Sequence, residues 1–454
     1  MSIQSVNPAT GEIIKTYQRH NDADIEAALE KGHAAFQVHR KTDMQDRQKK
    51  MRDVADYLEN SKEQYARLMT QEMGKLYTAS IAEVEKCASL CQYYADHAPD
   101  FLADQHVETD AEASFVRYLP IGIVLAVMPW NFPFWQVFRF AVPALMAGNV
   151  GVLKHASNVP GCALAIEDIF TKNGFENGVF QTLLIGSDKV ERIIADHRVR
   201  AVTLTGSEKA GSAVAAQAGK YLKKSVLELG GSDPFIIMPS ADINQSIELA
   251  VKGRVQNNGQ TCIAAKRYII HADIYDEYRS KLIERFEALK VGDPMDKETD
   301  VGPLSTPQIR DELQEQVDET LGAGATKLCG AEVIEGAGNF YAPGLLENIH
   351  EDSTAYKDEL FGPVGLLFKV GDLDEAITLA NDTRFGLGSV ICTNDENEII
   401  RVINELEAGV TFVNDTVSSN PALPFGGVKQ SGYGRELADA GIREFTNIKT
   451  IVVR

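Results

Sequence analysis

The sequence predicts an α/β protein built around a doubly wound parallel sheet. From about residue 121 to residue 413, short apolar, β-prone runs alternate with longer helical stretches, as in parallel strands joined by crossover helices. The run 121–127 is apolar on both faces, which a strand buried inside such a sheet requires. Ligands of these sheets bind at the carboxyl ends of the strands, so the loops after the strands are the expected place for a site.

The first 120 residues precede this alternation and are mostly helical. Residues 22–105 are rich in Ala, Leu, Glu, Lys and Met, with apolar residues three or four positions apart, as in amphipathic helices. A short strand is expected at 13–17, and an alternating strand at 114–119. The β-prone tail 447–454 has an unpaired edge that favours pairing with another chain.

The alternation in the middle of the chain restarts after Gly230 and Gly231, where we place a domain boundary. A second α/β unit is expected beyond it. The expected strands of the two units are 121–127, 150–154, 180–184, 201–204, 235–238 and 267–271, and the clearest helices are 243–256 and 274–289.

Composition and charge exclude several classes of protein. The 454 residues are 44% apolar and 24% charged, as in globular proteins, and no apolar run approaches the roughly 20 residues of a membrane helix. A net charge of −20 argues against nucleic acid and anionic membranes as partners. The N-terminus lacks the features of a signal peptide. Six cysteines without a CxxC pair indicate a reducing compartment, hence a cytoplasmic location, and nine scattered histidines show no metal-ligand spacing.

Cys262 is the strongest candidate for chemistry. It follows Gly259 in a stretch of small and polar residues, and a thiolate is the best protein nucleophile near neutral pH. Three other residues lie where they could assist. Glu228, among apolar residues and glycines, is expected to have a raised pKa that suits a general base. Asn131, between two prolines, is a suitable oxyanion donor, and Glu359 lies on a further turn.

Six segments together resemble the aldehyde dehydrogenase superfamily, in the order that this family has them, and the resemblance covers essentially the whole chain. They are Pro-Trp-Asn-Phe-Pro (129–133), Thr-Gly-Ser-Glu-Lys-Ala-Gly (205–211), Leu-Glu-Leu-Gly-Gly (227–231), Gly-Gln-Thr-Cys (259–262), Glu-Leu-Phe-Gly-Pro-Val (359–364) and Pro-Phe-Gly-Gly-Val-Lys-Gln-Ser-Gly (424–432).

The resemblance implies a fold of three parts. Residues 1–229 would form a Rossmann-type dinucleotide-binding domain, with an oligomerisation strand near 110–120. Residues 230–425 would form an α/β catalytic domain that carries the nucleophile. Residues 426–454 would return to the first domain and end in a small β oligomerisation arm, so that a homodimer or homotetramer is expected.

The resemblance also implies a mechanism. Cys262 would attack an aldehyde to give a thiohemiacetal whose oxyanion is held by Asn131. Hydride would pass to a nicotinamide dinucleotide, and Glu228 would activate the water that hydrolyses the thioester. The residues that the resemblance places at the cofactor are Trp130, Lys154, Ser157, Gly206, Ser207, Leu229, Glu359 and Phe361.

The same motifs indicate which cofactor and aldehyde to expect. Ser157 stands where relatives that prefer NAD commonly carry Glu, so it removes repulsion of a 2′-phosphate, and Lys154 adds positive charge; NADP is expected over NAD. Arg139 and Ser419, with Trp135, resemble the substrate-binding residues of bacterial succinate-semialdehyde dehydrogenases. An Arg–carboxylate pair would select an aldehyde with a distal carboxylate.

Three alternatives remain open at this point. The substrate could be another aldehyde, either glutarate semialdehyde or a neutral aliphatic one. The protein could be a catalytically idle, cofactor-binding structural protein, although the presence of Cys262, Glu228 and Asn131 argues against that. A thiol hydrolase would need a histidine base, and no histidine is evidently placed near these motifs.

Overall fold

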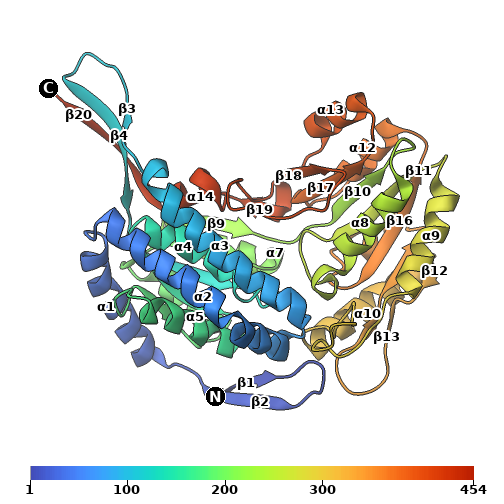
Figure 1. The fold of residues 1–454 in the computed structure, drawn as a ribbon, viewed down its shortest axis with the longest axis horizontal. Helices are drawn as coiled ribbons and strands as arrows, with labels where there is room; N and C mark the ends of the chain where they lie inside the picture. The colour runs from blue at the N-terminus through green and yellow to red at the C-terminus, as the bar shows by residue number, and fades with distance from the viewer. Residues whose placement is uncertain (1) are drawn as a thin grey trace.

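The computed structural model describes residues 2–454, which form two large sheets side by side, a layer of helices and a projecting β arm (Figure 1). The chain begins with a hairpin of β1 (Ser2–Val6) and β2 (Ile13–Gln18). The short strand expected at 13–17 corresponds to β2. The sequence did not predict β1, which is a strand because it pairs with β2.

Three long helices follow and confirm the helical prediction from 22 to 101, whereas its last residue, Gln105, lies in a strand. They are α1 (Asp22–His39), α2 (Met44–Met73) and α3 (Tyr77–Phe101). Asn21 begins α1 because its side chain accepts from the backbone N–H groups of Ala23 and Asp24. Gly74 ends α2 with a φ of +79°, a conformation that costs glycine little. α1 packs on the first large sheet, and α2 and α3 pack on each other and on the helices that cover this sheet.

The first large sheet is doubly wound, in the order β19-β9-β8-β5-β6-β7. β5 lies in its centre with β6 on one side and β8 on the other, so the direction of winding reverses there and a crevice opens at the carboxyl ends of these strands. The elements are β5 (Ile123–Met128), α4 (Trp135–Met146), β6 (Val150–His155), α5 (Pro160–Lys172), β7 (Phe180–Thr182), α6 (Val190–Ala195), β8 (Val199–Thr205), α7 (Glu208–Lys220), β9 (Lys224–Glu228) and the late strand β19 (Gly432–Tyr433).

The second large sheet has the order β12-β15-β16-β11-β10-β17-β18, and all its neighbouring strands are parallel except the β12–β15 pair. Its faces are covered by apolar side chains of the helices between the strands. The elements are β10 (Asp233–Ile237), α8 (Ile243–Val255), β11 (Ala265–His271), α9 (Tyr275–Glu287), α10 (Pro307–Gly322), β12 (Thr326–Cys329), β15 (Gly344–Glu347), α11 (Thr354–Lys357), β16 (Val364–Val370), α12 (Leu373–Asn381), β17 (Gly388–Cys392), α13 (Glu396–Glu405) and β18 (Val410–Val413), with a small hairpin of β13 (Glu332–Val333) and β14 (Tyr341–Ala342).

The chain then returns to the first sheet through β19 and α14 (Ala438–Glu444) and ends in β20 (Thr446–Val453). β20 pairs antiparallel with β4 (Ala113–Pro120), which also pairs with β3 (Gln105–His106), and this three-stranded arm projects from the body of the molecule (Figure 1). The strands expected at 114–119 and 447–454 are thus confirmed, whereas the domain limits at 229 and 425 stay a prediction. Within residues 2–454, no helix has the length and apolar character needed to cross a membrane.

Candidate active site

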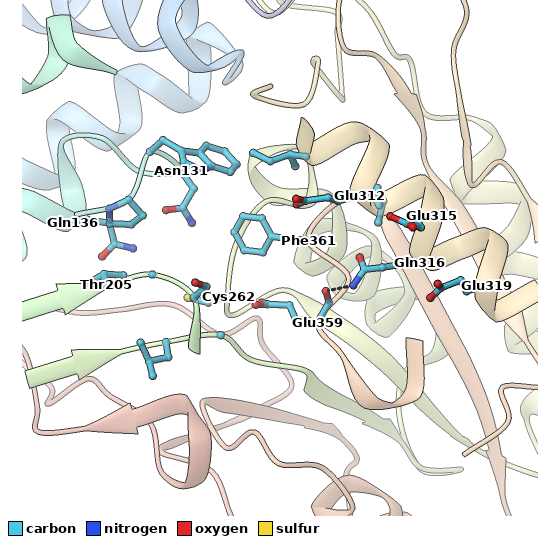
Figure 2. A pocket seen from close by; sticks show the side chains of 18 residues that line it. Asn131, Gln136, Thr205, Cys262, Glu312, Glu315, Gln316, Glu319, Glu359 and Phe361 are labelled. Carbon is cyan, nitrogen blue, oxygen red and sulfur yellow. Dashed lines mark hydrogen bonds between the residues drawn. The ribbon is translucent and has the colours of Figure 1, made fainter. Parts of the chain in front are cut away.

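Two cavities meet at Cys262, which lines both of them. The larger, of about 660 Å³, lies between loops of the first sheet and α10, and Figure 2 shows Cys262 and Asn131 on one side and the polar face of α10 on the other. The smaller, of about 190 Å³, is lined by residues of α3, α4 and the segment around Ser419. Pockets for drug-sized ligands have volumes of about 300–1,000 Å³, so the smaller cavity suits a short molecule.

The loop that carries Cys262 is fixed by its backbone. It leaves α8 through a turn, Gln256–Gly259, in which Asn257, Asn258 and Gly259 all have positive φ. The side chain of Asn258 donates to the carbonyls of Gly74 and Pro303, 3.0 Å away in each case. A Cβ at Gly259 would lie 2.4 Å from the backbone of Gly362, so only glycine fits there.

The environment of Cys262 favours its neutral thiol. Burial raises the pKa of the thiol to about 12, and the nearby charge of Glu359 adds to this, while Lys266 and Arg139 oppose it. The ammonium of Lys266 donates to the carbonyl oxygen of Cys262 at 2.8 Å and pairs with Glu359 at 2.9 Å. Cys262 therefore carries a protonated sulfur at neutral pH, and its reaction needs a proton acceptor.

Asn131 lies in the loop after β5, tied to the cysteine loop by two hydrogen bonds. Its Nδ2 donates to the carbonyl oxygen of Gln260 at 3.0 Å, and its own carbonyl accepts from Nδ2 of Asn257 at 2.8 Å. An amide nitrogen carries two hydrogens, so one N–H of Asn131 remains for a ligand. The structure therefore brings Asn131 and Cys262 together on one cavity wall.

Glu228 ends strand β9 and is buried, with 2% of its surface exposed. Burial raises the pKa of its carboxyl group well above its usual range, and the charge of Glu436 adds to this, whereas Arg139 and Arg435 oppose it. The expected rise in pKa is thus confirmed. Glu228 itself lines neither of the two cavities that meet at Cys262. A Cβ at Gly426 would lie 2.7 Å from its carboxylate, so this glycine leaves room for it.

Six of the eight residues expected at the cofactor line the larger cavity, namely Trp130, Gly206, Ser207, Leu229, Glu359 and Phe361. The rings of Trp130 and Phe361 meet edge to face, with centroids 5.8 Å apart. Ser207 begins α7 by accepting from the N–H of Ala210 at 3.3 Å, so the positive end of that helix faces this cavity.

The other two expected residues, Lys154 and Ser157, line a separate cavity of about 710 Å³. The first hairpin supplies part of its wall, as does Arg19, which follows the hairpin and pairs with Asp188 at 3.0 Å. The charge of Arg19 helps burial to lower the pKa of Lys154. The cavity lined by Trp130 and Phe361 provides aromatic faces and a helix N-terminus, and the cavity lined by Lys154 and Ser157 provides a basic end. Together these groups fit a nicotinamide dinucleotide phosphate.

The three residues expected at the substrate, Arg139, Trp135 and Ser419, line the smaller cavity with Cys262. Nε1 of Trp135 donates to Oγ of Ser419 at 3.1 Å. Arg139 is buried, which excludes a surface arginine. It forms an ion pair with Glu436 and packs on the ring of Phe425, 4.8 Å from the ring centroid. The positive charge of Arg139 is therefore already matched by a carboxylate.

The sequence did not single out three residues that the structure places at the site. Glu436 follows the Pro-Phe-Gly-Gly segment and could have been noticed as an acid close to a motif. Gln136 lines both cavities that meet at Cys262. Lys86 lines the smaller cavity and donates to Oγ of Ser419 at 3.0 Å. No local signal marks Lys86, because its place depends on packing against residues some 330 positions away.

Comparison with known proteins gives a consistent result. A family model described as "Aldehyde dehydrogenase family" matches residues 1–451. A protein named "Probable succinate-semialdehyde dehydrogenase [NADP(+)]" from Synechocystis sp. is 52% identical over 452 residues, which cover 99% of each chain. A "Succinate-semialdehyde dehydrogenase [NADP(+)] 1" from Mycobacterium tuberculosis is 52% identical over 454 residues, again 99% of each chain.

A solved structure is similar over the whole fold. It is the succinic semialdehyde dehydrogenase from Streptococcus pyogenes in complex with NADP+, which superposes with a TM-score of 0.97 at 39% sequence identity and covers 99% of both chains. The expected α/β fold and the resemblance read from the six motifs are thereby confirmed.

Proposed function

The chain belongs to the aldehyde dehydrogenase family, and from this we propose that it oxidises succinic semialdehyde to succinate, with NADP preferred over NAD. The observation that carries the proposal is the position of Cys262, where a large cavity suited to a dinucleotide meets a small, basic one. A hydride can pass only between groups in contact, and this arrangement lets a short aldehyde on Cys262 face the cofactor.

In the proposed first step, Sγ of Cys262 loses its proton to water and bonds to the aldehyde carbon, whose oxygen becomes negative as the C=O π bond opens. The free N–H of Asn131 stabilises this oxyanion, and such a donor contributes about 3 kcal/mol. The tie between Asn131 and Gln260 sets the position of that donor before the reaction begins. A bound nicotinamide dinucleotide would supply the hydride acceptor, and loss of the hydride from the aldehyde carbon would leave a thioester on Cys262.

In the proposed second step, Glu228 in its carboxylate form removes a proton from water, which attacks the thioester and releases succinate and the thiolate of Cys262. Burial of Glu228 supports this role because a raised pKa makes a carboxylate a stronger base. Trp130, Leu229, Glu359 and Phe361 would hold the nicotinamide end of the cofactor.

The preference for NADP rests on the basic cavity of Lys154 and Ser157. Ser157 carries no negative charge, so a 2′-phosphate meets a hydroxyl donor and the ammonium of Lys154 instead of a carboxylate. The names of the relatives from Synechocystis sp. and M. tuberculosis, and the cofactor of the S. pyogenes structure, support the same preference. Gly206 and Ser207 would face the pyrophosphate.

The experiment that tests the proposal measures kcat/KM for succinic semialdehyde and for butyraldehyde, each with NADP and with NAD. A hydrogen bond to a charged carboxylate is worth about 1.5–3 kcal/mol, so the semialdehyde should be preferred at least about tenfold. Ser157→Glu should move the cofactor preference towards NAD.

With glutarate semialdehyde added as a third substrate, each alternative gives a different result in this experiment. Equal rates with both aldehydes would favour a neutral aliphatic substrate, and a higher rate with glutarate semialdehyde would favour the longer chain. The idle structural protein would give no burst of NADPH with any aldehyde, and its function would then be binding alone.

A further inference from the structure

We propose that Lys86 is the residue whose positive charge binds the distal carboxylate of the substrate, and thus determines specificity for an ω-acid aldehyde. The inference rests on the proposed function. It differs from the expectation that the sequence raised, in which Arg139 has this part.

The charges around the smaller cavity single out Lys86. Three cationic side chains line it, Lys75, Lys86 and Arg139. Lys75 forms a buried ion pair with Glu83, and Arg139 forms one with Glu436. Lys86 has no carboxylate within ion-pairing distance anywhere in residues 2–454. An incoming carboxylate would therefore find one unmatched cation in this cavity, and that cation is Lys86.

The contacts of Lys86 hold its ammonium group in place. Its Nζ donates to Oγ of Ser419 at 3.0 Å and lies 4.2 Å from the centroid of the Trp135 ring. A cation over the face of an indole is favourable, and more so where water is excluded. The ammonium group has three donors, so after its bond to Ser419 it still has hydrogens for a carboxylate.

The hydroxyl group of Ser419 is a second donor for a carboxylate. Its Oγ accepts two hydrogen bonds, one from Nζ of Lys86 and one from Nε1 of Trp135. A hydroxyl oxygen has two acceptor sites and one hydrogen, so both acceptor sites are used and only the O–H remains. The O–H must donate to an acceptor, and a carboxylate is an acceptor only. Lys86 and Ser419 together thus form a pair of donors for one carboxylate.

The pKa of Lys86 is consistent with a site that binds an anionic ligand. Burial lowers the pKa of Lys86 to about 8, and the charges of Arg139 and Lys75 lower it as well, while Cys87 and Glu83 act in the opposite direction. Lys86 is therefore protonated below about pH 8 and loses its charge above it. A bound carboxylate would favour the protonated form, since an opposite charge raises the pKa of an amine.

The test compares kcat/KM for succinic semialdehyde with that for butyraldehyde in wild type, Lys86→Met and Lys86→Arg. Lys86→Met should lower the ratio of the two values by roughly 10- to 100-fold, and the loss should fall in KM, because the carboxylate is remote from the reacting carbon. Lys86→Arg keeps the charge and should restore part of the ratio. Lys62→Met, which removes a half-buried lysine of the neighbouring helix α2 that pairs with Glu85, is the matched control and should leave the ratio unchanged.

A pH profile provides a readout that a merely structural lysine would not affect. In wild type the ratio should fall as the pH rises through about 8, because Lys86 loses its proton there while Cys262 and Glu228 influence both aldehydes alike. In Lys86→Met this step should be absent.

The outcomes separate this inference from the proposed function. No preference for the semialdehyde in wild type would overturn the proposed substrate, and the role of Lys86 with it. A preference in wild type that Lys86→Met retains would overturn the role of Lys86 alone and return it to Arg139. If Lys86→Met does not fold, Ser419→Ala decides, since loss of the hydroxyl donor should lower the same ratio; an unchanged ratio there would count against the site.

Discussion

At the scale of single residues, burial raises the pKa of both groups proposed for catalysis. The pKa of Cys262 is raised to about 12, and that of Glu228 is raised well above its usual range. Each group is a strong nucleophile or base once it has lost its proton, and burial opposes the loss of that proton in both. The rate of reaction therefore depends on how readily these two protons leave.

Glu228→Gln should slow steady-state turnover by about 10²- to 10⁴-fold, since it removes the proposed base for thioester hydrolysis. The first turnover should still release one NADPH per active site, and stopped-flow absorbance measures both phases. In wild type the steady-state rate should rise with pH, because the raised pKa of Glu228 delays formation of its carboxylate to higher pH.

Glu405→Gln is the matched control, since Glu405 is an acid on α13 that pairs with Arg401 at the surface. It should leave both phases as in wild type. A Glu228→Gln enzyme with full steady-state turnover would show that another group activates the water.

Sequence alone identified the residues that sit in motifs, because each motif is a short continuous stretch whose loop geometry is local. Cys262, Asn131 and Glu359 are of this kind, and all three line one cavity. Lys86 and Glu436 were missed for the opposite reason. Lys86 donates a hydrogen bond to Ser419, and Glu436 forms an ion pair with Arg139. Such contacts depend on how distant segments of the chain pack.

At the scale of elements, helix α3 lines the smaller cavity and also contacts the start of helix α4. Glu83 and Lys86 are three residues apart on this helix and so lie on one face of it. Oε1 of Glu83 accepts from the N–H groups of Phe134 and Trp135, 2.9 Å away in each case, where α4 begins without a capping side chain of its own. The same Glu83 pairs with buried Lys75. One carboxylate thus satisfies the start of α4 and a buried ammonium.

Glu83→Ala should destabilise the fold by about 3–5 kcal/mol, because it leaves the ammonium of Lys75 buried without its partner. The loss is measured as a lower midpoint of denaturant unfolding. Glu85→Ala on the same helix removes a more exposed ion pair with Lys62 and should cost at most about 1 kcal/mol. Equal stability of the two variants would show that the Lys75–Glu83 pair adds nothing.

The elements themselves were largely predictable, since periodicity reports which faces are buried. The helices of 22–105 and the strands that begin near 150, 201, 235 and 267 were found in this way. β1 was missed because its two apolar residues, Ile3 and Val6, are three positions apart and do not alternate, so its pairing with β2 determines it more than its own pattern does.

At the scale of the whole molecule, the β arm exposes apolar side chains that a monomer would leave in water. Ile448, Val452 and Val453 on β20 are 61%, 55% and 44% exposed. Exposed apolar residues on a projecting sheet edge indicate an interaction surface, and we propose that a second copy of the chain covers it.

Deletion of residues 447–454 removes nearly all of β20 and leaves β4 without that partner. The deleted protein should have a lower native mass than the full chain, because the proposed contact between copies is lost. Size-exclusion chromatography with light scattering measures the mass, and circular dichroism shows whether the fold is kept. An unchanged mass with an intact fold would place the contact elsewhere.

The cavity that holds Lys154 and Ser157 has walls from three distant parts of the chain, among them Gln4 in the first hairpin and Thr306 ahead of α10. A ligand there can bind only when all three parts are folded and in place. By mass action, such a ligand stabilises every part that it contacts, by about 2.7 kcal/mol at a hundred times its dissociation constant. The cellular level of the dinucleotide would thereby help to set the lifetime of the folded protein as well as its rate of turnover.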